Sequence, residues 1–135
     1  MTRFAGALLA ISSLLAATPL LAHHSFAAEF DSEKQINLTG AVTKVEWMNP
    51  HARFYIDVKD DSGTVTNWEL ELGSPNALMR LGWTRNSLKP GEVVSVEGSL
   101  AKDGSKLANA RKITLADGRK VFAGSAADEN KPDSK

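Results

Sequence analysis

The stretch that decides the fold is WELELGSPNALMRLGW, residues 68–83. In its first half, apolar and acidic side chains alternate in the order Trp68, Glu69, Leu70, Glu71, Leu72. A period of two puts the apolar groups on one side of an extended chain, so this half predicts a half-buried strand. The two glutamates share the other side, where such a pair is usually only a solvated surface.

The second half of the stretch predicts a short helix. Ser74 can accept hydrogen bonds from the first-turn amides, and Pro75 is tolerated at the first helical position. Gly82 can take the left-handed conformation that ends a helix, and a Schellman closure there would bring Trp83 back to the helix. The expected inward face consists of Ala77, Leu78 and Leu81.

Strand patterns lie on both sides of this helix. Three come before it, at about residues 36–47, 52–58 and 66–72, and three follow it, at 92–98, 109–115 and 119–122. The apolar side chains of the first change phase after Val42, so we expect a β-bulge near Thr43 and Lys44. Asp60–Gly63 is predicted to be the hairpin turn between the second and third strands.

This order of elements predicts an all-β protein, a small five-stranded Greek-key barrel of the OB type. In the OB-fold, a long bulged first strand and a helix between strands three and four close the barrel. The final short strand would add a terminal hairpin. The alternative is an open sandwich of the same strands, and the position of the single helix favours the barrel.

Composition narrows the classes of function. The chain has 135 residues, with 16 basic and 16 acidic side chains and no cysteine. A near-neutral chain has no field that gathers polyanions, so we expect no nucleic-acid partner. The lack of cysteine excludes disulfides, thiolate metal sites and thiol nucleophiles. Since nucleophile-elbow, phosphate-loop and HExxH patterns are also missing, the sequence does not predict an enzyme.

Residues 1–22 have the pattern of a cleaved export signal. The segment has a basic start and then an apolar run that Pro19 interrupts, and the predicted cut is after Ala22. A cut after Ala27 or Ala28 is the alternative. An uncleaved anchor needs about 17–25 apolar residues, so we expect a periplasmic or secreted protein without stable membrane insertion. The remaining chain divides into a leader (23–34), the barrel (35–123) and a disordered tail (124–135).

Several motifs together resemble a family of exported bacterial proteins of unknown function. They are HHSF at residues 23–26, LTGAVTKVEWMNPHARFYIDV at 38–58, WELELGSPNALMRLGWTRNSLKPGEVVSVEGSLAKDGS at 68–105 and ARKITLADGRKVFAG at 110–124. The resemblance covers residues 23–124 and implies export and an OB-like fold, but no established activity. Arg53 stands where the family usually has an aromatic residue, which weakens a stacking role there.

The histidines suggest a metal site. A cut after Ala22 would make His23 the first residue, so its free amine and ring nitrogen could form a chelate. A third nitrogen from His51 would complete a T-shaped histidine brace, which suits Cu(II). His24 could replace or supplement either imidazole, with Glu29 and Asp31 as weak or outer partners. Because protons compete for these nitrogens, affinity should fall on acidification.

A plainer interpretation stands beside this one. The two leader histidines could simply be solvated, and His51 could cap a strand or bond to Asn49. The protein would then be a metal-free module that binds a glycan, a peptide or an envelope protein along the face of strands two and three. The candidate contact residues on that face are Trp47, Asn49, Arg53 and Tyr55.

Overall fold

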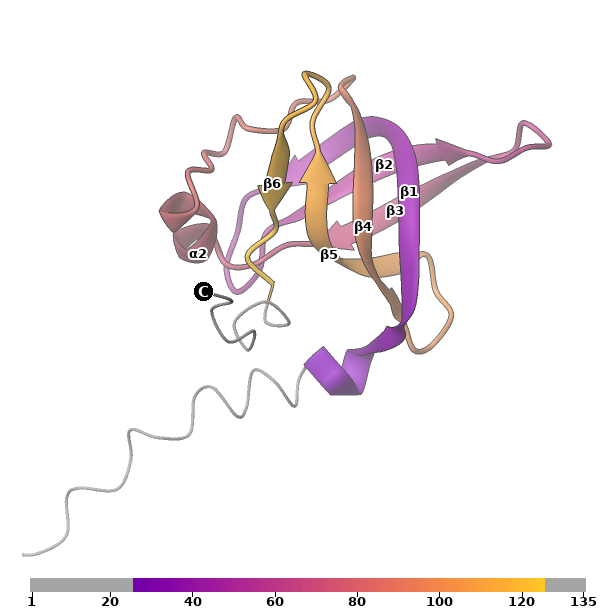
Figure 1. Cartoon of the computed structure of the whole chain (residues 1–135), viewed down its shortest axis with the longest axis horizontal. Helices are drawn as coiled ribbons and strands as arrows, with labels where there is room; N and C mark the ends of the chain where they lie inside the picture. Colours follow the sequence, from indigo (N-terminus) through magenta and orange to yellow (C-terminus); the bar gives the residue numbers. More distant parts are fainter. Residues whose placement is uncertain (1–25, 126–135) are drawn as a thin grey trace, which may run out of the picture.

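The computed structural model describes residues 26–125 of the chain. Residues 26–29 are helical and lead into the elements of Figure 1: β1 (Phe30–Glu46), β2 (Arg53–Lys59), β3 (Val65–Glu71), α2 (Pro75–Arg80), β4 (Val93–Ala101), β5 (Leu107–Thr114) and β6 (Lys120–Phe122). The predicted signal, His23, His24 and most of the predicted tail lie outside the described residues. None of the helices within 26–125 has the length and apolar character needed to cross a bilayer.

The strands form one sheet that closes on itself. Their order is β3-β2-β1-β4-β5-β6, and β3 also pairs with β5. The β3–β5 pairing is parallel, whereas the other pairs are antiparallel. Five strands therefore make a closed Greek-key barrel with β6 as a hairpin extension, and α2 lies between β3 and β4. The predicted OB-like fold is confirmed, and the β3–β5 pairing excludes the open sandwich.

The long first strand serves both halves of the barrel. Its first part pairs with β4 and its last part with β2, and the β2 register breaks between Val42 and Lys44. This irregularity is the predicted bulge, which bends the strand and increases its twist. The strand also begins at Phe30, so residues 30–34 of the predicted leader belong to the barrel.

The helix begins and ends as predicted, but one expected inward residue does not lie inward. Ser74 accepts a hydrogen bond from the Ala77 amide, and the amides of Gly82 and Trp83 donate to the carbonyls of Met79 and Leu78, which is the Schellman pattern. Leu81, in contrast, is 52% exposed. The helix has already ended at Arg80, so the 3.6-residue period no longer places Leu81 against the barrel.

Buried apolar side chains form two separate clusters. The larger, here called the barrel core, fills the barrel and includes Phe54, Ile56, Leu70, Leu72, Leu78, Trp83, Val94, Val96 and Ile113. The smaller, here called the leader cluster, consists of Phe26, Phe30 and Ala101, with Leu107 packed against it. The rings of Phe26 and Phe30 have centroids 5.6 Å apart. The leader is therefore fastened to the barrel outside the barrel core.

The C-terminal part of the fold extends past the predicted boundary at Ala123. The Gly73 amide donates to the Ala123 carbonyl, and Gly124 lies so close to Gly73 that a side chain at position 73 would overlap its carbonyl oxygen. Ser125 is only 1% exposed. Gly124 and Ser125, which we expected to start a disordered tail, thus belong to the barrel.

Candidate functional site

His51 lies where the loop after β1 enters β2. The next residue, Ala52, is buried, and its backbone exchanges hydrogen bonds with the carbonyl of Gly73 and the amide of Leu72. These bonds extend the β2–β3 ladder by one step, so the backbone beside His51 is fixed. The His51 side chain remains 44% exposed.

Acidic side chains of β3 lie opposite this corner. In the β2–β3 register, Arg53 faces Glu71 and Tyr55 faces Glu69. His51 Nδ1 lies 3.5 Å from Glu71 Oε1, and Arg53 Nη2 lies 3.8 Å from Glu71 Oε2. Arg53 Nη1 also donates to Glu69 Oε1 at 2.7 Å, and the Tyr55 hydroxyl donates to the same oxygen at 3.4 Å. The site is thus a network in which the Arg53 guanidinium contacts both carboxylates and the His51 imidazole contacts that of Glu71.

Glu71 is the unusual member of this network because it is only 6% exposed. Burial raises the pKa of its carboxyl, while the charges of His51 and Arg53 and a hydrogen bond from the Asn109 side chain lower it. The charge of Glu29 raises the pKa of Glu71 as well. Glu29 precedes β1 and Asn109 lies in β5, so three separate parts of the chain meet at this carboxylate.

The remaining part of the predicted binding face is also occupied by internal contacts. The Lys44 ammonium lies 5.3 Å from the centre of the Tyr55 ring and forms an ion pair with Glu46. Burial raises the pKa of Tyr55. The cationic and aromatic groups that we expected to contact a ligand, Arg53 and Tyr55, are therefore already in contact with neighbouring side chains.

The other predicted site residues are dispersed. Trp47 is half-buried and packs against the barrel core, which leaves little of its ring for a ligand. Asn49 is exposed in the turn, before a cis peptide bond to Pro50. Of the predicted residues, the structure brings together His51, Arg53 and Tyr55, because they are every second residue of the chain as it enters β2.

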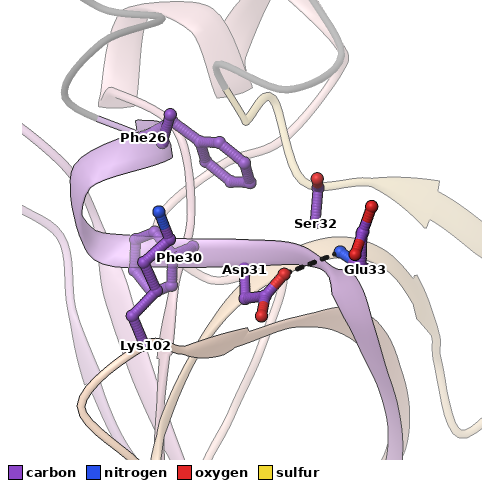
Figure 2. Close-up of a pocket in the computed structure, with 7 residues that line it drawn as sticks. Phe26, Phe30, Asp31, Ser32, Glu33 and Lys102 are labelled. Atoms are coloured by element: carbon purple, nitrogen blue, oxygen red, sulfur yellow. Dashed lines mark hydrogen bonds between the residues drawn. The ribbon is translucent and has the colours of Figure 1, made fainter.

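Asp31, expected as an outer metal partner, lines a pocket of about 380 Å³ at the start of β1. Figure 2 shows this pocket, with the carboxylate of Asp31 accepting a hydrogen bond from the Glu33 amide and Phe26 and Phe30 nearby. Neither His51 nor Glu71 lines the pocket. Of the two carboxylates expected to support the metal, Glu29 is thus the one whose charge acts on the His51 corner.

Sequence reasoning missed Glu71, which it assigned to a solvated surface. The signal was available in part: a tight hairpin turn at Asp60–Gly63 fixes the register, and counting back from the turn pairs Arg53 with Glu71. The environment of its carboxylate could not be predicted, because Asn109 comes from β5 and Glu29 from the segment before β1.

The described residues alone do not make a complete metal site. Among residues 26–125, no group of three or more histidine, aspartate, glutamate or cysteine side chains is close enough to hold a metal ion. His51 and Glu71 contribute one imidazole and one carboxylate. A metal at this corner therefore requires further ligands, and His23 and His24 lie outside the described residues.

A closed five-stranded barrel with a helix between β3 and β4 makes this an OB-fold protein. The chain belongs to the family of unknown function DUF6152, which it matches over residues 11–110. The resemblance to a family of unknown function with an OB-like fold is thereby confirmed. No curated protein matches the chain.

Solved structures with a similar fold share little sequence with the chain. The mitochondrial single-stranded DNA binding protein Rim1 of S. cerevisiae is 13% identical, with 61% of this chain and 92% of that chain covered and a TM-score of 0.48. The N-terminal domain of PriB from Thermoanaerobacter tencongensis is 20% identical, with 62% and 97% covered and a TM-score of 0.42.

Proposed function

We propose that the protein is a small exported binding protein that holds Cu(II) between its mature N-terminus and His51. One observation carries the proposal: Nδ1 of His51 faces the buried carboxylate of Glu71, and the side chain is 44% exposed. The other ring nitrogen, Nε2, lies on the side of the imidazole away from Glu71, where it can bind a ligand. A carboxylate behind the inner nitrogen of an imidazole is the usual arrangement around protein-bound metals.

The path of the leader supports a site shared with His51. The charge of Glu29 acts on Glu71, and the Glu29 carbonyl accepts a hydrogen bond from the Lys102 amide at 2.9 Å. Phe26 is held in the leader cluster. His23 comes only three positions before Phe26, a span of at most about 11 Å. After cleavage, the free amine of His23 would therefore belong to a segment that is anchored near His51.

The chemistry of this corner favours a cation. After a cut at Ala22, His23 would supply an amine and a ring nitrogen and His51 would supply Nε2, and three nitrogens suit the tetragonal preference of Cu(II). His24 is the alternative second imidazole. Around them, four carboxylates, those of Glu29, Glu46, Glu69 and Glu71, stand against two cationic side chains, those of Lys44 and Arg53. The same excess supports the expectation that a polyanion such as nucleic acid does not bind here.

Export is part of the proposal because the brace needs a free amine at His23. The family match begins at residue 11, inside the predicted signal, so part of that segment is common to the family. The product of cleavage would be a periplasmic or secreted protein.

The second candidate is a metal-free module for a glycan, a peptide or an envelope protein. It has less support, because Arg53 and Tyr55 would have to exchange their contacts with Glu69 and Lys44 for contacts with the partner. Neither candidate invokes catalysis.

The test uses protein secreted with its natural signal, with the mature terminus determined by sequencing. We expect one equivalent of Cu(II) to give an electron paramagnetic resonance spectrum with several equatorial nitrogens. His51→Ala should remove one nitrogen and weaken binding, and an extra residue placed before His23 should remove the amine ligand. Met48→Ala, which alters an exposed residue of the same loop, is the control and should behave like the wild type.

Two results would overturn the copper proposal. One is a mature terminus other than His23. The other is a copper spectrum that lacks nitrogen hyperfine structure, or that stays the same in both the His51→Ala variant and the extended protein. Binding of a glycan or peptide array by metal-free protein would then favour the second candidate.

A further inference from the structure

We infer that Glu71 is a positioning residue for His51. It holds the imidazole as the tautomer with the proton on Nδ1, so that the unprotonated Nε2 faces outward. The inference deepens the proposed copper site and rests on it for its functional meaning, but the state of the ring can be measured without any metal.

The His51 ring lies close to the buried carboxylate of Glu71. Glu71 Oε1 lies 3.5 Å from His51 Nδ1, and the Glu71 side chain is 8% exposed. An ionised carboxylate can only accept hydrogen bonds, and a buried one is costly unless N–H or O–H groups face it. His51 meets this need only with a proton on Nδ1. The buried carboxylate therefore selects the tautomer.

The surrounding strands keep Glu71 from turning away from His51. It is the last residue of β3, paired with Arg53 of β2 on one side and with Asn109 of β5 on the other. The Asn109 side chain also bonds to its carboxylate, and the Arg53 guanidinium lies 3.8 Å from its second oxygen. The barrel closes at this point, so the carboxylate is held by two strands. A group held on rigid strands can fix the orientation of another group that is more exposed.

The tautomer of His51 decides which group of the ring faces an incoming cation. In water the neutral imidazole of histidine favours the form protonated on Nε2, which would turn an N–H toward an incoming cation. Protonation on Nδ1 instead presents the Nε2 lone pair, the form that binds a metal. A ring already in this form need not change tautomer or orientation when it binds, which reduces the cost of binding.

Glu69 provides a matched control two residues earlier on the same face of β3. Its Oε1 accepts hydrogen bonds from Arg53 and Tyr55, whereas His51 is paired with Glu71. Both carboxylates share Arg53, so a change at either one alters the charge around the guanidinium. Only a change at Glu71 should alter the ring of His51.

The experiment is long-range ¹H–¹⁵N NMR of the metal-free, secreted full-length mature protein at a pH where histidines are neutral. His51→Ala identifies the signals of His51. We expect the wild type and Glu69→Gln to show His51 protonated on Nδ1. In Glu71→Leu the ring should change to the form protonated on Nε2, while Glu71→Gln, which keeps a carbonyl acceptor, should restore part of the Nδ1 form.

Copper affinity is then measured on the same proteins by competition with a chelator. Loss of a carboxylate behind a metal-bound imidazole costs about 10–100-fold in affinity, so we expect that loss in Glu71→Leu. Glu69→Gln removes a charge of the same network without touching the His51 ring, so we expect a clearly smaller loss of affinity there. A change of tautomer without a change of the fold is a result that a merely structural role for Glu71 would not give.

The outcomes separate this inference from the copper site. His51 protonated on Nε2 in the wild type would overturn the inference even if Glu71→Leu does not fold. Copper bound through His51 with equal affinity in Glu71→Leu and the wild type would also overturn it, and would leave the copper site standing. An Nδ1 proton that depends on Glu71 in a protein that binds no copper would uphold the positioning of the ring and reject its role toward the metal.

Discussion

The barrel core and the leader cluster differ in size and in the part of the chain that they hold. The barrel core joins side chains from every strand of the closed barrel and from α2. The leader cluster has only three buried residues, and two of them, Phe26 and Phe30, lie at the start of the described chain. A small cluster at the edge of a domain can open while the rest stays folded.

This difference matters because the candidate site draws on both clusters. His51 and Glu71 are fixed by the barrel, whereas Glu29 and the segment before it are held through Phe26 and Phe30. A change in the barrel core should therefore remove the fold and the site together. A change in the leader cluster should weaken the site and leave the barrel folded.

The largest effect is expected for Phe54→Ala. Phe54 is fully buried in the barrel core, and loss of a buried phenyl ring typically costs about 3–5 kcal/mol. Urea unfolding followed by circular dichroism should show a single transition at a much lower midpoint. Phe122→Ala is the control, since Phe122 is 57% exposed and should change the midpoint little. A loss of stability in Phe54→Ala as small as in the control would mean that this core does not stabilise the barrel.

A smaller loss is expected for Phe30→Ala. Phe30 is 2% exposed, but its neighbours in the leader cluster are few and can close part of the space. The cost of such a deletion depends on how well the site collapses, so we expect roughly 2 kcal/mol. The wild-type circular dichroism spectrum should be kept while copper affinity falls. Equal losses of stability in Phe30→Ala and Phe54→Ala would show that the two clusters act as one core.

Phe26→Ala should mainly release the leader. Phe26 is 9% exposed, and we expect its loss to lower the free energy of unfolding by less than about 1 kcal/mol, because the leader can detach locally. The clearest measurement is hydrogen exchange at the Lys102 amide, which donates to the Glu29 carbonyl. Exchange there should become faster, while the Ala52 amide, which donates to Gly73, serves as the reference in the barrel. Equal acceleration at both amides would contradict a separately held leader.

Whether a feature could be predicted from the sequence depends on how far apart its residues lie along the chain. The bulge at Thr43, the closure of α2 at Gly82 and the turn at Asp60–Gly63 were all predicted, because each depends on residues a few positions apart. The barrel followed from the order of such elements. The prediction that Leu81 lies inward was wrong, also for a local reason. It extended the helical period one residue past the end of a short helix.

The parts that could not be predicted depend on contacts between distant segments. The buried carboxylate of Glu71 interacts with His51, with Asn109 in β5 and with the charge of Glu29 in the leader, and no pattern within β3 indicates this environment. The start of the barrel at Phe30 depends likewise on pairing with Ala101 in β4. Residues whose environment comes from three elements are the ones that form the candidate site, so the site was predicted less completely than the fold.

The smallest effect is expected in the turn that the sequence predicted, for Asp60→Ala. Asp60 Oδ1 accepts hydrogen bonds from the Ser62 and Thr64 amides, and hydrogen bonds from Ser62 and Thr64 lower the pKa of Asp60. A lowered pKa means that its contribution is present above 3.8, the ordinary value, and is lost as the pH falls below it. Urea unfolding should therefore show a small difference between wild type and variant at pH 7 that shrinks toward pH 3. Asp61→Ala, an exposed carboxylate of the same turn, is the control. A difference that does not depend on pH, or one larger than that of Phe26→Ala, would show that an exposed turn contributes more to the barrel than the leader cluster does.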